Sequence, residues 1–490
     1  MDLLNRSLSS IKWYAVSNIT RNMIYLVRSI ILARLLAVEL FGIYGLALAI
    51  VSVSVRFSSF GMDGAFLNRV DETEDIEKAA SVHFSLICLF TAVWALFLLS
   101  GSFFLSEGDL RIALMTLVVV FGLMQLTETP KLILRRKVVH QRLAVINIID
   151  AVFGSLAAVF LAQQGYGILS LLSINIFSLA VFILVLYLYK PVWKIRIGWS
   201  VKTVKYYLNF GFQSFLGGIL FEIIDRVDDI WTGIFLGDRA LGFYSRAYSF
   251  ATYPTKLLAD PINRVALGYY ADLKAKKQQL SQAFLLSNGV LVRSGFLFGG
   301  LLALIAPEFI VIVIGEKWMP MLSIFRLMLF FTLLNPLKIT TSHLFVGVGK
   351  PLEMVRARML QVLVLIGGLF LFGPRWETDG IAMAVNLTIV VGLGYMMVRA
   401  KRYVSFSIKK LFLAPMIALV FGLIGGFWVS SEWYVGQVNI ISGLIKSITF
   451  TGLYAAILLL LEKSVTIQMF QILFKRDVIK ENSSDKTGLQ

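Results

Sequence analysis

The feature that most constrains this chain is a succession of apolar runs, each long enough to cross a lipid bilayer as a helix. Such a crossing needs roughly 20 mostly apolar residues. About fourteen runs can be marked, approximately at residues 13–34, 40–62, 80–105, 110–128, 142–163, 166–189, 206–236, 240–263, 283–306, 320–345, 356–374, 379–399, 410–431 and 438–461. The sequence therefore predicts an all-α, polytopic membrane protein.

Basic residues are spread unevenly over the loops between these runs. When the N-terminus is placed inside, about two thirds of the 46 lysines and arginines fall in inner loops or termini. The outer loops, all short, hold only Arg34, Arg111, Arg239, Lys317 and Arg375. Cytoplasmic loops carry the basic excess in membrane proteins. We therefore expect both termini in the cytoplasm, and we assign the net charge of +17 to the membrane surface rather than to nucleic-acid binding.

Several classes of chemistry lack their sequence signals. The only cysteine is Cys88, and the histidines His83, His140 and His343 are far apart, so neither a disulfide nor a metal-ligand pattern is present. The segment Gly347–Pro351 lacks the spacing of a phosphate-binding loop. We expect no cofactor and no enzymatic activity, and coupling to a proton, a sodium ion or the membrane potential stays open.

Short motifs recur in the same order along the chain. Leu40–Tyr44 is matched by Ala240–Tyr244 about 200 residues later, and Asn68–Val70 is matched by Asn263–Val265. Six spans is an even number, so two such halves have the same orientation, as in transporters with parallel repeats. The predicted organisation is a six-helix lobe at 1–200, a second at 201–405, a two-helix hairpin at 406–465 and a cytoplasmic polar tail at 466–490.

Four predicted spans, the first two of each half, carry polar residues on one helical face. They are Asn18, Arg21, Tyr25 and Arg28; Ser52, Arg56, Ser59 and Asp63; Glu222, Asp225, Arg226, Asp228 and Asp229; and Arg246, Ser249, Tyr253, Lys256, Asp260 and Asn263. A charge at the bilayer centre costs roughly 2.5–3.5 kcal/mol on insertion scales. We therefore predict that these faces line one polar translocation cavity.

The abundance of arginine favours an anionic ligand, because guanidinium groups bind phosphate oxygens through paired hydrogen bonds. The candidate ligand-binding residues are Arg21, Arg28, Arg56, Arg246 and Lys256. The candidates for lining the cavity or coupling an ion are Asn18, Tyr25, Glu222, Asp225, Asp228, Asp229 and Tyr253. The alternative is a structural ion pair of Arg28 or Arg246 with Asp225 or Asp229.

Two motifs carry a family resemblance. Ala33–Leu36 followed by Phe41–Tyr44, and Leu241–Ser249 followed by Pro254, resemble the signatures of the two halves of bacterial polysaccharide transporters. On these residues the chain resembles the Wzx-type oligosaccharide flippases of the MOP (multidrug/oligosaccharidyl-lipid/polysaccharide) superfamily. The resemblance implies a MATE-like fold of two six-helix lobes with an added helix pair.

The resemblance also implies a function. Such proteins move oligosaccharides linked to undecaprenyl pyrophosphate from the inner to the outer leaflet of the bacterial inner membrane, by alternating access. The product serves O-antigen, capsule or exopolysaccharide synthesis. The implied partners are the lipid-linked substrate, membrane lipids, and the polysaccharide polymerase and glycosyltransferases of the same pathway. By analogy with related lipid II flippases, Arg21, Arg28, Arg56 and Arg246 are expected to hold the pyrophosphate.

Two alternatives remain. A MATE-like, cation-coupled antiporter has the same fold but favours an acidic cavity. A membrane polysaccharide polymerase or ligase usually keeps a large outer loop with catalytic residues, and the predicted outer loops are short.

Overall fold

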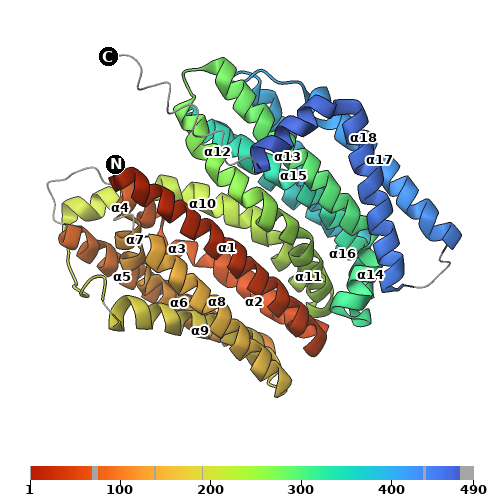
Figure 1. Ribbon diagram of the computed structural model, residues 1–490. Helices are drawn as coiled ribbons and strands as arrows, with labels where there is room; N and C mark the ends of the chain where they lie inside the picture. The colour runs from red at the N-terminus through yellow and green to blue at the C-terminus, as the bar shows by residue number, and fades with distance from the viewer. Residues whose placement is uncertain (1, 69–75, 137–139, 190, 434–437, 475–490) are drawn as a thin grey trace, which may run out of the picture. The chain divides into compact units, whose positions relative to one another are not determined.

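The computed structural model describes residues 2–68, 76–136, 140–189, 191–433 and 438–474 (Figure 1). Within these ranges every regular element is a helix. The chain divides into two compact units. Unit 1 comprises Met1–Tyr253 and Arg358–Thr388, and unit 2 comprises Pro254–Ala357 and Ile389–Gln490.

Unit 1 contains the first eleven α-helices. They are α1 (Asp2–Leu35), α2 (Val38–Ser54), α3 (Arg56–Ser59), α4 (Met62–Asn68), α5 (Ile76–Ser102), α6 (Asp109–Leu126), α7 (Glu128–Arg136), α8 (His140–Gln163), α9 (Ile168–Ile183), α10 (Val201–Leu236) and α11 (Asp238–Pro254), with the π-helical segment η1 (Leu184–Leu188) after α9. Helix α1 packs along α8, and α10 packs against α2 and α4. This packing brings the polar helices α1, α2, α10 and α11 into one compact unit.

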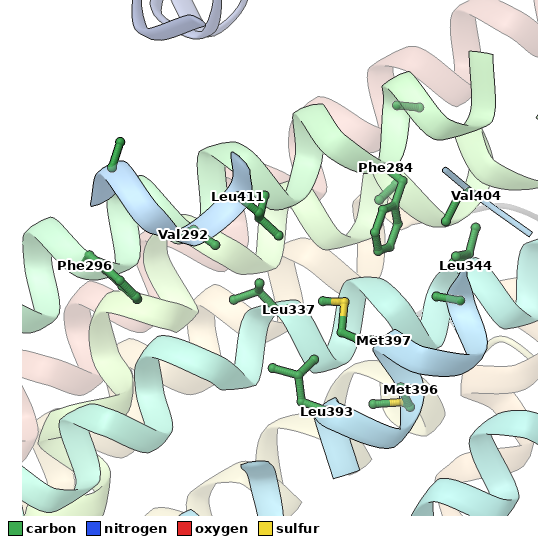
Figure 2. Packing of buried hydrophobic residues seen from close by; sticks show 14 of the residues in the cluster. Phe284, Val292, Phe296, Leu337, Leu344, Leu393, Met396, Met397, Val404 and Leu411 are labelled. Atoms are coloured by element: carbon green, nitrogen blue, oxygen red, sulfur yellow. The ribbon is translucent and has the colours of Figure 1, made fainter. Parts of the chain in front are cut away.

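Unit 2 is held together by a large apolar core. Its helices are η2 (Thr255–Ala259), α12 (Asp260–Asp272), α13 (Lys277–Leu304), α14 (Ala306–Glu308), η3 (Phe309–Ile314), η4 (Glu316–Met321), α15 (Leu322–Gly347), α17 (Ile408–Trp433) and α18 (Ile440–Phe474). Figure 2 shows part of this core, in which Phe284, Leu344 and Met397 are buried together. Helices α17 and α18 pack on each other and on α13.

The helix α16 (Pro351–Ala400) contributes to both units. Its backbone is not helical at Trp376 and Glu377, so it consists of two helices joined at a kink. Eleven helical stretches of the described chain are long and apolar enough to cross a membrane, and α16 is one of them. The polar helices α1 and α11 lie outside that set but correspond to the predicted first and eighth spans. The all-helical, multi-pass fold class is confirmed.

The predicted second span is not one continuous helix. Phe60 and Gly61 both have positive φ angles, of 44° and 68°, and they separate α3 from α4. The prediction that Asp63 shares one helical face with Ser52 and Arg56 is therefore wrong. Asp63 lies on α4, where its Oδ1 is 3.4 Å from Nε2 of the buried His83.

The predicted stripe on the eighth span is also interrupted. After Pro254 the chain continues as the π-helical segment η2, which changes the rotation per residue and so the face that later residues share. The prediction that Lys256, Asp260 and Asn263 continue the face of Arg246 is therefore wrong. Asn263 is instead buried in unit 2, where its Oδ1 accepts a hydrogen bond from Thr340.

Two further boundaries differ from the predicted ones. The predicted span at 356–374 begins five residues earlier than expected, because α16 starts at Pro351. Residues 466–474, expected in the tail, belong to α18, and the rest of the predicted tail, 475–490, lies outside the described residues.

Helices α2 and α11 approach each other closely at two equivalent glycines. A side chain at Gly42 would overlap the carbonyl oxygen of Asp238, and a side chain at Gly242 would overlap the carbonyl oxygen of Val38. Only glycine permits backbones to come so near. This close approach gives a physical reason for the glycine that the two motifs share.

Candidate anion-binding site

Helix α1 supplies a run of polar side chains at the spacing of a single face. Arg21 Nη2 donates a hydrogen bond to Asn18 Oδ1 at 2.7 Å. One to two turns further along, Arg28 Cζ lies 4.4 Å from the centre of the Tyr25 ring, a cation–π contact. Because an α-helix has 3.6 residues per turn, the side chains of Asn18, Arg21, Tyr25 and Arg28 lie on the same face of α1.

Helix α11 adds a further arginine to the same region of unit 1. Arg246 Nη1 donates a hydrogen bond to Ser29 Oγ of α1 at 3.3 Å. Its guanidinium carbon lies 4.7 Å from the ring centre of Phe41, on α2. Arg246 therefore lies beside α1, where it also interacts electrostatically with Arg28.

A carboxylate from α8 completes this group, and the sequence analysis missed it. Tyr25 Oη donates to Asp150 Oδ2 at 3.5 Å. Asp150 also interacts electrostatically with Arg28 and Arg21. A lone acidic residue in an otherwise apolar run was the signal for it, since intramembrane carboxylates are rare and usually functional.

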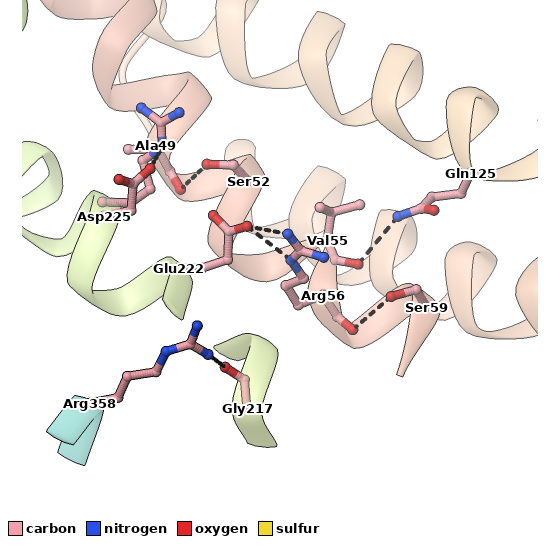
Figure 3. A network of polar contacts seen from close by, with 11 residues as sticks. Ala49, Ser52, Val55, Arg56, Ser59, Gln125, Gly217, Glu222, Asp225 and Arg358 are labelled. Atoms are coloured by element: carbon pink, nitrogen blue, oxygen red, sulfur yellow. Dashed lines mark hydrogen bonds and ion pairs between the residues drawn. The ribbon is translucent and has the colours of Figure 1, made fainter. Parts of the chain in front are cut away.

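A second polar contact joins α3 to α10. Arg56 Nε donates to Glu222 Oε1 at 3.0 Å, and Arg56 Nη2 binds the same oxygen (Figure 3). The Glu222 side chain is only 11% exposed, whereas Arg56 is 44% exposed. Both were predicted site residues, and the structure pairs them with each other.

The acidic residues of α10 have their own partners. Arg226 forms ion pairs with Asp225 at 3.7 Å and with Asp229 at 3.4 Å. Asp228 is buried and accepts a hydrogen bond from Tyr244 Oη. Among the described residues, Arg226 on the same helix is the cation in ion-pair contact with these carboxylates, and Arg246 interacts with Asp229 only electrostatically, without an ion-pair contact.

The last two predicted site residues belong to different units. Tyr253 is half-buried at the end of α11, and Lys256 is exposed in η2 of unit 2. Their role in a ligand site stays a prediction.

The arginines of α1 and α11 differ in one respect from the other charged residues of this region. No carboxylate of the described chain forms an ion pair with Arg21, Arg28 or Arg246. The buried Nε atoms of Arg21 and Arg246 have no hydrogen-bond partner. Guanidinium groups with unused donors in a partly buried place are suited to bind an oxyanion. In the residues described, no three metal-ligating side chains are grouped as a metal ion would need.

Solved structures share this architecture. The chain is similar to the lipid II flippase MurJ in an inward closed conformation, with a TM-score of 0.76 and 17% identity over 92% of this chain and 99% of that one. It is also similar to an inward-facing multidrug-resistance MATE transporter of the MOP superfamily, with a TM-score of 0.59 and 14% identity over 79% of this chain and 98% of that one. The chain thus has the multi-pass, all-helical fold that these two solved membrane proteins share.

Sequence comparison narrows this class to a family. The chain belongs to the polysaccharide biosynthesis protein family, whose model matches residues 31–323. It is 23% identical to the lipopolysaccharide biosynthesis protein WzxC of Escherichia coli, over 81% of this chain and 80% of that protein. It is 25% identical to the succinoglycan biosynthesis transport protein ExoT of Rhizobium meliloti, over 89% of each chain.

Proposed function

We propose that this protein is a flippase for lipid-linked oligosaccharides, and that it moves them from the inner to the outer leaflet of the bacterial inner membrane. The observation that carries the proposal is the set of three arginines, Arg21, Arg28 and Arg246, that have no carboxylate ion pair in the described chain. Unpaired positive charge in a membrane-spanning helix is costly and usually marks a ligand path. Asp150 interacts electrostatically with Arg21 and Arg28, and Asp229 with Arg246, but neither carboxylate is in ion-pair contact with these arginines, and a pyrophosphate would supply an anion that binds them directly.

The comparisons support the same class of substrate. Two relatives are named for polysaccharide synthesis or transport, and a protein of similar fold is named a lipid II flippase. On this proposal the prenyl chain stays in the bilayer while the sugars and pyrophosphate enter the polar region. Both termini are cytoplasmic, and the pathway's glycosyltransferases and polymerase act before and after the transfer.

Alternating access needs a contact that closes one side and later opens. The close approach of Gly42 and Gly242 to the opposite helix is suited to this role, because backbone contact excludes water and substrate alike. It lies at the beginning of α2 and α11, which the charge distribution places at the outer face. In this proposal, substrate enters from the inner leaflet while the contact is closed.

The acidic residues of α10 favour a second candidate, a cation-coupled antiporter. Asp228 is buried against Tyr244, and a buried carboxylate is a possible site for a coupling proton. The two candidate functions differ in the charge of the transported compound. A flippase binds an anionic pyrophosphate and needs the three arginines, whereas an antiporter for cationic compounds does not. Ion coupling through Asp228 is compatible with the flippase as well.

The test is the fate of lipid-linked glycan in cells that lack the protein. Accumulation of undecaprenyl-linked oligosaccharide facing the cytoplasm, with surface polysaccharide restored by the wild-type gene, supports the flippase. Unchanged surface polysaccharide together with reduced efflux of cationic compounds would instead favour the antiporter.

A further inference from the structure

Arg358 lies in a membrane-spanning helix and has no acidic partner among the described residues, unlike several other basic residues of the spans. Several basic residues of the spans form ion pairs: Arg56 with Glu222, Arg226 with Asp225 and Asp229, Arg293 with Glu462, Arg399 with Glu353, and Lys446 with Glu308. No carboxylate of the described residues pairs with Arg358. It shares this property with Arg21, Arg28 and Arg246, although it lies on another helix.

The surroundings of Arg358 hold its guanidinium in place without neutralising it. Arg358 Nη1 donates to the backbone oxygen of Gly217 on α10 at 3.0 Å, and its Cζ lies 5.3 Å from the ring centre of Phe221. Figure 3 shows the side chain of Arg358 reaching to Gly217 of α10, which lies five residues before Glu222 in the sequence. Because Glu222 already binds Arg56, the nearest acidic residue along α10 is occupied.

The guanidinium retains donors for a ligand. It has five N–H donors, and its single hydrogen bond in the described chain uses one of them. The side chain is half-buried rather than enclosed. A β-carbon added at Gly217 or at Gly218 would meet nothing within 4 Å, so no other side chain is packed onto the outer side of this turn of α10.

The position along the helices indicates where such a ligand would be. Arg358 is seven residues from the start of α16 at Pro351, or about 10 Å at 1.5 Å per residue. The charge distribution places this end of α16 at the inner face. On this expected orientation, the long arginine side chain is one to two helical turns from the inner surface and can reach toward the phosphates of inner-leaflet lipids.

We propose that Arg358 is a second anion-binding residue, which takes a phosphate oxyanion at the inner end of α10 and α16. Either of two sources can supply that oxyanion: the pyrophosphate of an entering lipid-linked substrate, or the phosphate of a bilayer lipid. The first source rests on the proposed function, whereas the second does not.

The test uses the full-length protein in detergent with two probes, geranyl pyrophosphate and phosphatidylglycerol, whose binding is measured by native mass spectrometry. Arg358→Gln keeps an amide donor for Gly217 but removes the charge, and Arg358→Lys keeps the charge. The matched control is Arg356→Gln, because Arg356 lies on the same helix, is 59% exposed and pairs with Glu353.

We expect Arg358→Gln to weaken binding of at least one probe about tenfold, the loss of one charge-assisted hydrogen bond. Arg358→Lys and Arg356→Gln should bind nearly as the wild type does, and all variants should keep its melting temperature. The probe whose binding is weakened by Arg358→Gln identifies the source of the oxyanion. If Arg358→Gln binds both probes as tightly as the wild type, the residue only anchors α16 to α10 and the inference is wrong. Wild-type protein that binds phosphatidylglycerol but no geranyl pyrophosphate would count against the proposed function instead, and would leave the anion site standing.

Discussion

Glu39 and Arg239 form an ion pair between α2 and α11, with 3.6 Å between Glu39 Oε1 and Arg239 Nε. The two residues occupy equivalent positions in the repeated motifs, three residues before Gly42 and Gly242. The glycines make the backbone contacts, and the ion pair lies at its edge, where both side chains are partly exposed. One short motif, used twice, thus builds both sides of one helix crossing.

The first prediction concerns the two glycines of this crossing. Gly42→Val and Gly242→Val should each lower the free energy of unfolding by about 1–3 kcal/mol, the usual cost of forcing extra atoms into a packed contact. The two effects should be similar, because each new side chain meets a backbone carbonyl. The measurement is the melting temperature of the purified protein in detergent. Gly394→Val is the control, since a β-carbon there has open space. If Gly42→Val and Gly242→Val melt at the same temperature as Gly394→Val, the close contact between α2 and α11 does not contribute to stability.

The second prediction concerns movement at the same crossing. In a background with Cys88→Ser, which removes the only native cysteine, Glu39→Cys and Arg239→Cys should be joined by a short bifunctional thiol reagent. The joined protein should not restore surface polysaccharide, and a reducible reagent should allow activity to return after reduction. Undiminished transport in fully cross-linked protein would mean that this contact never opens during the cycle.

The third prediction separates two roles of Arg56. The pair with Glu222 joins an exposed arginine to a nearly buried carboxylate, because the side chains are 44% and 11% exposed. Arg56→Ala leaves the carboxylate of Glu222 without its partner, so it should lower the free energy of unfolding by about 1–3 kcal/mol. It should also reduce glycan export strongly, because the exposed guanidinium can contact the substrate as well. The charge-exchanged double variant Arg56→Glu/Glu222→Arg should recover the melting temperature without recovering export. If the exchange recovers both, Arg56 serves only the ion pair.

The fourth prediction tests a buried ion pair in unit 2. Arg293 binds Glu462, and their side chains are 10% and 18% exposed. Removing one partner leaves a buried charge, so Arg293→Met should cost about 3–5 kcal/mol. The double variant Arg293→Met/Glu462→Met should regain most of that loss, because apolar side chains of similar size can replace a buried pair. Thermal unfolding of both variants is the measurement, and a double variant no more stable than the single one would contradict it.

The helices could be predicted from the sequence because the bilayer leaves little choice. A chain in lipid must satisfy its backbone hydrogen bonds internally, so a long apolar run becomes a helix. The breaks inside the helices could not be predicted in this way. The positive φ angle of Phe60 and the π-helical turn after Pro254 depend on local packing, and each changes which residues share a face.

The candidate site was predictable only in part, for a related reason. The face of α1 follows from helical periodicity, and Asn18, Arg21, Tyr25 and Arg28 lie on it. Partner choice among charges depends on tertiary contacts, so neither the pairing of Arg56 with Glu222 nor that of Arg226 with its neighbours on α10 could be chosen among the alternatives. Arg358 was missed because it stands alone at the end of a predicted span, and its contacts with Gly217 and Phe221 of α10 depend on tertiary packing.

The most direct test of the central claim is flipping of a prenyl-pyrophosphate-linked oligosaccharide by the full-length protein in liposomes, read out as accessibility of the sugar to an added glycosidase. Wild-type protein should flip it. Arg28→Ala and Arg246→Ala should each slow it about tenfold or more, since each removes a charged hydrogen-bonding group from the anion. The exposed Arg375→Ala should behave as the wild type. Flipping at the wild-type rate by both Arg28→Ala and Arg246→Ala would contradict the claim that these arginines hold the pyrophosphate.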